Sequence, residues 1–159
     1  MDSLLYLAIL CAALGSGLIA GVLFAFSSFI MRALARLEPA DGIAAMQAIN
    51  ITVVTPLFIG ILIGLAPLCL LLGGWALLTW SDPGSVFVLA GSVLYLVGTL
   101  MVTGVLHIPM NNALAVVEAH GEGAAEHWHH YVARWTAWNH VRTTAALLAA
   151  AAFTLAYWS

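Results

Sequence analysis

The stretch LLYLAILCAALGSGLIAGVLFAFSSFIM, at residues 4–31, carries no charged side chain. It is longer than the ~20 apolar residues that a helix needs to cross a lipid bilayer. It also lacks the basic start and the short apolar core of a cleavable signal peptide, so we expect it to stay in the mature protein. This segment therefore predicts a transmembrane helix.

The composition of the whole chain supports the same class. Hydrophobic residues make up 64% of the sequence and charged residues 7%, whereas ordinary soluble domains are about 25% charged. The chain has four arginines, no lysine and a net charge of −3, which does not resemble a surface that binds nucleic acid. The composition therefore excludes a water-soluble globule and predicts no nucleic-acid partner.

Three further apolar segments follow the first, separated by short polar turns. We expect one transmembrane domain over residues 1–159, with helices at approximately 4–36, 42–80, 86–118 and 126–158. Because short turns force consecutive helices to run antiparallel, the predicted fold is all-α, an integral membrane antiparallel four-helix bundle. Pro56 and Pro67 lie inside the second segment, where proline is expected to kink the helix.

The arginines indicate which way the bundle crosses the membrane. All four lie near the turns that join the first helix to the second and the third to the fourth. The positive-inside rule places those two turns in the cytoplasm and both termini outside. We expect this orientation in a bacterial inner membrane, with an aromatic belt at the outer interface made by Trp75, Trp80, Tyr157 and Trp158.

Residues 107–142 form the polar part of this apolar chain and contain all six histidines. Both ends of the stretch merge into apolar segments, so its first and last polar residues are expected at or below the membrane surface. Polar groups at that depth are costly and usually have a partner or a function. The candidate catalytic residues are therefore the ones placed there: His107, Asn111, Asn139, His140 and Arg142.

Depth along the helices predicts which polar residues meet. The third and fourth helices pair about a centre near residue 123 or 124. This places His107 opposite His140, and Asn111 opposite Thr136, one turn from Asn139. On the second helix, Asn50 lies one to two turns from the same cytoplasmic end. These residues are therefore expected to share one level of the bundle.

Aromatic residues on the fourth helix are expected to form a wall at this level. Spacings of three and four residues put Tyr131, Trp135 and Trp138 on one helical face, with Arg142. We therefore predict a polar pocket in the cytoplasmic half of the bundle, and the candidate substrate-binding residues are Asn50, Tyr131, Trp135 and Trp138.

Each of these features also has a structural interpretation. An aromatic stripe often serves helix packing and interfacial anchoring, and embedded asparagines often join helices by hydrogen bonds. Arg142 is the hardest residue to explain in this way, because its side chain would have to extend over two helical turns to reach water.

The histidines leave metal binding open. Glu126 and His129 have the i, i+3 spacing of di-iron bundle ligands, but the first two helices offer only Glu38 and Asp41 as further carboxylates. A solvated loop is the main interpretation of His127, His129 and His130, and ligand binding by these three and by His120 is left open. The pair His107 and His140 offers two nitrogen ligands for a metal or haem.

Four patterns in the sequence resemble the anthrone oxygenase-like family of small four-helix membrane proteins. They are Gly21-x-x-Phe24-Ala25-Phe26, Met46-Gln47-x-Ile49-Asn50, Pro109-x-Asn111-x-x-Leu114 and Trp135-x-x-Trp138-Asn139-x-x-Arg142. They occur in order over nearly the whole chain. The resemblance implies oxidation of an anthrone to an anthraquinone with molecular oxygen. One departure is His107, where the family commonly carries asparagine.

The resemblance also implies roles for the candidate residues. An anthrone is a flat, weakly acidic carbon acid whose enolate is electron-rich enough to react with oxygen without a metal, so this interpretation requires no cofactor. Aromatic side chains would form the slot for it: Tyr131, Trp135 and Trp138. His140 or His107 would act as the base, because histidine changes its charge near neutral pH. Arg142, with Asn111 or Asn139, would stabilise the enolate oxygen.

A second hypothesis is a non-catalytic membrane module that binds haem, a quinone or lipid, or a small subunit of a larger complex. Haem or a metal would then bind through His107 and His140. In both hypotheses the expected partners are a small aromatic or quinone-like molecule and membrane lipid, and a homo-oligomer is left open.

Overall fold

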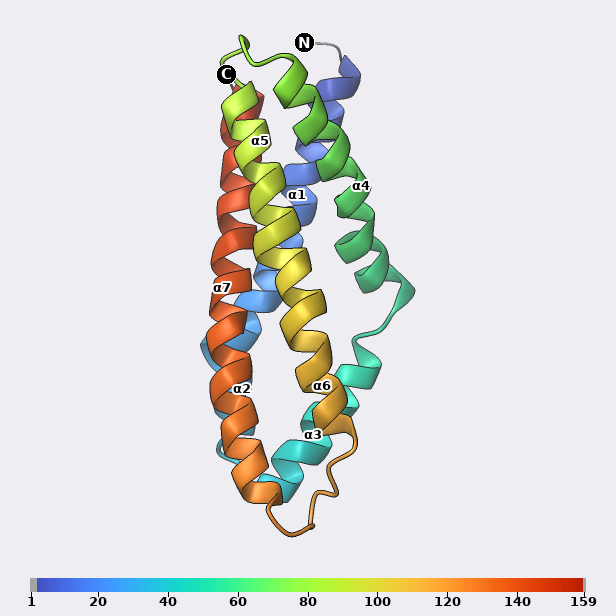
Figure 1. Cartoon of the computed structure of the whole chain (residues 1–159), viewed down its shortest axis with the longest axis vertical. Helices are drawn as coiled ribbons and strands as arrows, with labels where there is room; N and C mark the ends of the chain where they lie inside the picture. Colours follow the sequence, from blue (N-terminus) through green and yellow to red (C-terminus); the bar gives the residue numbers. More distant parts are fainter. Residues whose placement is uncertain (1–2, 159) are drawn as a thin grey trace.

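The computed structural model describes residues 3–158, and every regular element within them is helical. Figure 1 shows an elongated bundle of four long segments that run antiparallel, with the two ends of the chain at the same end of the bundle. The predicted all-α, antiparallel four-helix membrane bundle is confirmed.

The first and fourth segments pack along each other. The first is a continuous run of α1 (Ser3–Ala25), the π-helical segment η1 (Phe26–Ile30) and α2 (Met31–Leu34). The fourth is a single helix, α7 (Ala124–Trp158). α1 lies against α7, and α7 buries mostly alanine in its C-terminal half. Small residues let membrane helices approach closely, which explains this contact.

The second segment is broken in two, which corrects the single helix predicted over 42–80. α3 (Pro39–Thr52) ends and α4 (Pro56–Leu78) begins after three non-helical residues. The cause is Pro56, which disfavours helical backbone at the preceding residue. Thr55 is accordingly extended, with φ −96° and ψ 149°, and its side chain caps α4 by accepting from the backbone N–H of Phe58. Pro67 stays inside α4.

The third segment is the most irregular. It consists of α5 (Ser85–Val93), the π-helical segments η2 (Leu94–Met101) and η3 (Thr103–His107), and α6 (Ile108–Ala115). π-helical turns are rare and frequently occur at functional sites. η2 and η3 lie in the interior of the third segment, and η1 lies one turn before the end of the first.

The core is divided into two apolar clusters with polar residues between them. One cluster lies toward the chain ends and includes Ile19, Tyr95 and Phe153. The other lies toward the opposite end and includes Ile43 and Trp128. The polar residues between them define a polar layer. It is formed by the buried Ser27, Thr99, His107, Asn139, Arg142 and Thr143 and by the half-buried Thr103.

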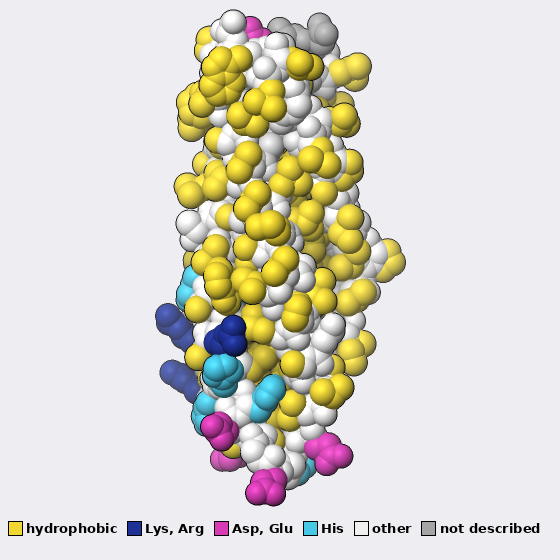
Figure 2. Space-filling model, in the orientation of Figure 1, with side chains coloured by type: hydrophobic (Ala, Val, Ile, Leu, Met, Phe, Trp, Pro, Cys, Tyr) yellow, Lys and Arg dark blue, Asp and Glu magenta, His cyan; other side chains and the backbone are white. Residues whose placement is uncertain are grey.

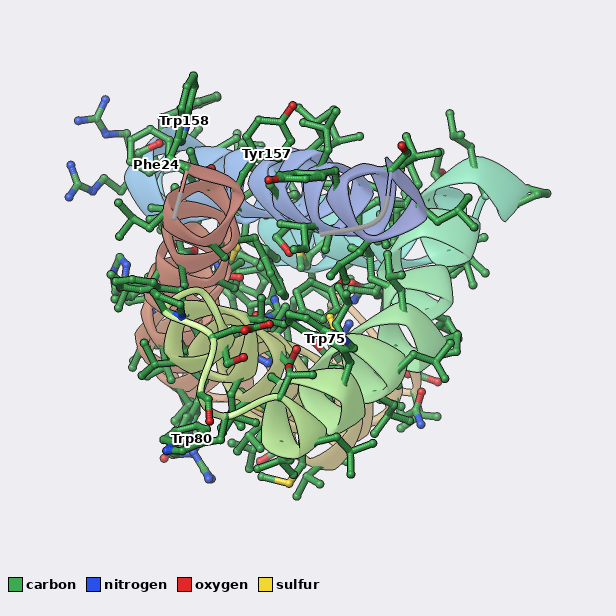
Figure 3. All side chains as sticks on the ribbon, turned by 90° about the horizontal axis from the view of Figure 1, so that it is seen from above. Phe24, Trp75, Trp80, Tyr157 and Trp158 are labelled. Atoms are coloured by element: carbon green, nitrogen blue, oxygen red, sulfur yellow. The ribbon has the colours of Figure 1, made fainter. Side chains whose placement is uncertain are left out.

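The outer surface fits a lipid environment. Four segments are long and apolar enough to cross a membrane: Ser3–Leu34, Pro56–Leu78, Ser85–Ala115 and Ala124–Trp158. Figure 2 shows hydrophobic side chains over most of the bundle, while arginine and histidine gather toward the end opposite the termini. Figure 3, viewed from the end that carries the termini, shows Trp80 and Trp158 at the rim of the bundle. The protein is therefore an integral membrane protein.

Candidate functional site

The four segments enclose a cavity of about 380 Å³ between the two apolar clusters. This volume lies in the range of about 300–1,000 Å³ that is typical of small-molecule sites. The cavity borders the break between α3 and α4, and its wall includes residues of all four segments. Most of the lining is apolar, and its polar side chains are Asn50, Thr103, His107, Asn111 and Arg142.

Arg142 is a buried cation on the wall of this cavity, with only 6% of its surface exposed. One terminal nitrogen donates to Thr103 Oγ1 at 3.1 Å and the other to Asn139 Oδ1 at 2.7 Å. Its Nε has no hydrogen-bond partner, and no carboxylate among residues 3–158 pairs with it. Because burying an unpaired charge is costly, this arrangement favours an anionic ligand.

Asn139 fixes the position of the guanidinium. Its Nδ2 donates to the Leu23 carbonyl and to Ser27 Oγ, both at 2.8 Å, so its Oδ1 is turned toward Arg142. Ser27 also lies 3.0 Å from Thr143 Oγ1. Asn139 is fully buried and does not line the cavity. It therefore acts as a support that ties α7 to α1 and η1.

Asn111, on α6, is also fixed by hydrogen bonds from α7. Its Oδ1 accepts two hydrogen bonds, from the Tyr131 hydroxyl at 2.9 Å and from Trp135 Nε1 at 3.0 Å. A carboxamide has one acceptor oxygen and one donor nitrogen. With the oxygen occupied by α7, the Nδ2 group of Asn111 remains as a donor on the cavity wall.

Trp135 is at the centre of the site. The Arg142 guanidinium carbon lies 5.4 Å from the centroid of its ring, a cation–π distance. The ring of Phe26 packs against it at 5.5 Å, and the ring of His107 meets it edge-on at 5.0 Å. The indole therefore contacts the cation, an aromatic wall and the histidine of the same cavity.

His107 is 1% exposed and lines the cavity from η3. Its Nε2 lies 3.3 Å from the Trp135 carbonyl oxygen, a long hydrogen bond. Because a carbonyl can only accept, this contact is a hydrogen bond in the tautomer that carries its proton on Nε2. Nδ1 is buried and has no hydrogen-bond partner within residues 3–158. The imidazole is thus oriented by the backbone of α7.

α3 contributes a fourth side to the site. Asn50 lies beside the Tyr131 hydroxyl. The Nδ2 atom of Asn50 is buried and has no hydrogen-bond partner among the described residues. One turn earlier, Gln47 Nε2 donates to the carbonyls of Leu114 and Val117, at 2.9 and 3.0 Å. Gln47 therefore fastens α3 to the end of α6 and keeps Asn50 at the cavity.

Four of the predicted site residues do not line the cavity, namely the buried Asn139 and Tyr131, and also His140 and Trp138. His140 is exposed and Trp138 is 37% exposed, and neither lines it. The helical repeat explains this, because the buried face of α7 runs through Tyr131, Trp135 and Asn139, and His140 follows one residue later. The expected pairing of His107 with His140 is therefore wrong, and the two do not form a ligand pair for haem or a metal.

The histidines of the turn lie at the far end of the bundle from the termini, and all are exposed: His120, His127, His129 and His130. Within residues 3–158, no group of three or more histidine, cysteine, aspartate or glutamate side chains could hold a metal ion. The proposed di-iron spacing of Glu126 and His129 is thus not completed by further ligands in the part of the chain that the structure describes.

Tyr131 does not line the cavity either, although it is buried and holds Asn111. The sequence-based interpretation missed Thr103, which accepts from Arg142 and lines the cavity. A signal for it existed, because Thr103 precedes His107 by four residues and so shares its helical face.

Fold and site together define a small four-helix membrane protein with a buried, cation-bearing cavity. A family model described as anthrone oxygenase matches residues 56–152, which is more than half of the chain. The chain belongs to this family, and the resemblance inferred from its sequence patterns is confirmed. Neither a curated protein nor a solved structure matches the chain.

Proposed function

We propose that the protein is a membrane-embedded oxygenase that oxidises a flat, anthrone-like or phenolic substrate with molecular oxygen in the cavity. The observation that carries the proposal is the buried guanidinium of Arg142, which lines the cavity without a carboxylate partner among the described residues. Membership of the anthrone oxygenase family indicates the reaction class.

The positive charge and the hydrogen-bond donors of the site can stabilise an enolate. Removal of a proton from the methylene carbon of an anthrone leaves negative charge on the carbonyl oxygen. Arg142 and the Nδ2 group of Asn111 are donors on the same cavity wall. Donors that are already fixed where charge develops lower the barrier most effectively, and the contacts of Asn139 and Trp135 fix these two.

His107 is the candidate base. It lines the cavity, whereas His140 does not, and its ring is oriented by Trp135. General base catalysis needs a group within hydrogen-bond reach of the proton that leaves. With Nε2 donating to the Trp135 carbonyl, the lone pair that could accept this proton is on Nδ1, which is buried without a partner in the part of the chain that the structure describes. The methylene carbon of the substrate would face this nitrogen when its carbonyl oxygen faces Arg142.

The reaction balances with oxygen as the only co-reactant. The enolate gives electrons to O₂, and a carbon–oxygen bond forms at the former methylene carbon to give a hydroperoxide. Loss of the second proton from that carbon, with cleavage of the oxygen–oxygen bond, yields the quinone carbonyl and water. Trp135 and Phe26, whose rings lie 5.5 Å apart, offer aromatic surface for the flat substrate.

The proposal includes an orientation in the membrane. Arg32, Arg36 and Arg134 are exposed, and Figure 2 shows arginine side chains toward the end of the bundle opposite the termini. The positive-inside rule places that end in the cytoplasm and both termini outside, in a bacterial inner membrane. The polar layer then lies in the cytoplasmic half of the bundle.

The test is turnover in reconstituted bilayer discs. With 1,8-dihydroxyanthrone as substrate, the wild-type protein should consume oxygen and form quinone in equal amounts, faster than empty discs or discs with the Arg142→Gln variant. If no turnover occurs but a quinone or lipid binds in the cavity and protects the protein against heat, the non-catalytic binding module replaces the oxygenase.

A further inference from the structure

The cavity has an opening on one side of the bundle. Four residues line the cavity and are also exposed on the outer surface: Val54 and Ile63 on one edge, and Gly104 and Ile108 on the other. α4 packs against α5 and η2 but makes little contact with η3 or α6. Figure 1 shows α4 diverging from the third segment toward the break at Pro56. The opening therefore lies between the start of α4 and the η3–α6 region.

The depth of Ile63 places this edge of the opening in the hydrocarbon layer. Trp80 and Trp158 are exposed at the end that carries the termini, as expected for residues at a membrane interface. Ile63 precedes the end of α4 by fifteen residues, which corresponds to about 22 Å along the helix. The hydrocarbon core is about 30 Å thick, so Ile63 lies within it.

The opening and the interior of the cavity differ in chemistry. The four exposed residues at the edge carry no polar side chain, whereas Arg142 is buried and Asn111 and Asn50 are half-buried. An apolar rim admits an uncharged molecule that is dissolved in lipid and hinders one that is hydrated or charged. A neutral carbon acid meets this condition, because its negative charge arises only after it has reached the base.

We infer that this opening is a lateral portal, through which a flat, uncharged aromatic substrate enters from the hydrocarbon core of the bilayer. The catalytic readout of this inference rests on the proposed oxygenase function. Gly104 is the position on this edge where a side chain can be added, because a Cβ built there meets no atom within 4 Å. Progressively larger residues at this position are therefore expected to occupy the opening.

The first experiment fills the portal in steps. Gly104→Ala, Gly104→Leu and Gly104→Trp are assayed in bilayer discs, with substrate expressed as its mole fraction in lipid. We expect kcat/KM to fall stepwise with side-chain size while kcat at saturation stays close to wild type. The matched control is Gly64→Trp, because Gly64 is also exposed and also meets no atom within 4 Å, but does not line the cavity. It should keep the wild-type kcat/KM.

The second experiment does not depend on catalysis. A small lipid-soluble carbene probe, 3-trifluoromethyl-3-phenyldiazirine, is photolysed in discs, and labelled residues are identified by mass spectrometry. Leu23 is nearly buried but lines the cavity, so we expect it to be labelled in wild type and protected in Gly104→Trp. Leu77, on the exposed face of α4, should be labelled equally in both.

The two experiments separate the two ideas. Labelling of Leu23 that is lost in Gly104→Trp supports the portal even if wild type fails to oxidise any anthrone, in which case only the oxygenase proposal falls. Equal labelling of Leu23 in wild type and Gly104→Trp, or unchanged kcat/KM in Gly104→Trp, overturns the portal.

Discussion

Asn139 and Arg142, one helical turn apart on α7, form a hydrogen bond of 2.7 Å in which the carboxamide oxygen accepts from the guanidinium. The amide nitrogen of Asn139 is committed to Leu23 and Ser27 on the first segment. The pair therefore couples the helix that carries the cation to the helix that packs against it. The cation is positioned by a neutral group, so its charge remains available to a ligand.

Substitution of Arg142 tests whether the charge or the shape of its side chain matters. Arg142→Lys keeps the charge but loses the planar fork that contacts Thr103 and Asn139. A hydrogen bond to a charged group is worth about 1.5–3 kcal/mol, so we expect kcat/KM to fall about tenfold to a hundredfold. Arg142→Gln should abolish turnover while the melting temperature stays the same or rises, because an unpaired buried charge is removed.

Thermal melting and oxygen uptake measure these effects. If Arg142→Gln unfolds in detergent and Arg142→Lys keeps full activity, Arg142 has a structural role and the reaction must occur elsewhere.

Asn139→Ala should destabilise the protein. It leaves the Leu23 carbonyl, Ser27 and the guanidinium short of a partner, at a cost of about 1–3 kcal/mol for each group left unsatisfied. Asn139→Asp instead supplies a carboxylate next to Arg142, and we expect it to abolish turnover by neutralising the cation. Melting temperature and anthrone oxidation distinguish the two variants. Full activity of Asn139→Asp would show that a free positive charge is not required.

Adjacent asparagines on α6 provide a matched pair. Asn111 lines the cavity and accepts from Tyr131 and Trp135, whereas Asn112 is exposed and makes no hydrogen bond among the described side chains. Asn111→Ala should lower kcat/KM by about tenfold or more, since one charge-assisted hydrogen bond is worth about 1.5–3 kcal/mol. Asn112→Ala should leave kcat/KM unchanged. Equal effects of the two substitutions would remove Asn111 from the site.

The two histidines should behave differently. General base catalysis contributes about 10²–10⁴-fold, so His107→Ala should lower kcat by a factor in this range. His140→Ala should have little effect, because its side chain is exposed outside the cavity. His107→Asn introduces the residue that the family commonly carries, and full turnover of this variant would assign the base role to another group. The optical spectrum of the purified protein completes the test, since a Soret band lost in His107→Ala would indicate haem.

Cysteine labelling tests the orientation. Asp82 lies in the exposed connection between α4 and α5, and Ala40 lies in the first turn of α3 at the opposite end of the bundle. In a Cys11→Ala background, with Cys69 buried, Asp82→Cys should react with an impermeant maleimide in intact cells and Ala40→Cys should not. The reverse pattern would place the arginine-bearing turns outside the cell.

The sequence predicts how far along the bundle each site residue lies. It predicts less accurately which way the side chain points around its helix. Counting from the turns brought Asn50, Asn111 and Arg142 to one level, and the structure places all three on one cavity. The same count does not show which way a side chain points around its helix, so it paired His107 with His140, which faces outward. Three π-helical segments shift the rotation of the first and third segments, and no sequence period reveals them.

The break in the second segment was only partly predictable. Pro56 and Pro67 have the same local effect on backbone hydrogen bonding, yet the chain breaks before Pro56 and continues through Pro67. The difference lies in the surroundings. α4 around Pro67 packs against α1 and α5, whereas the residues around Pro56 border the cavity and the lipid.

The π-helical segments set where the first and third segments can change length by one residue. A π turn accommodates one residue more than an α turn, so deleting a single residue inside η1 or η3 would convert it to regular helix and leave the residues beyond it at nearly the same rotation. A deletion in the regular helix between η3 and Asn111 would instead rotate all later residues of that segment by about 100°. Asn111 would then turn away from the cavity, whereas the residues before the deletion would keep their places.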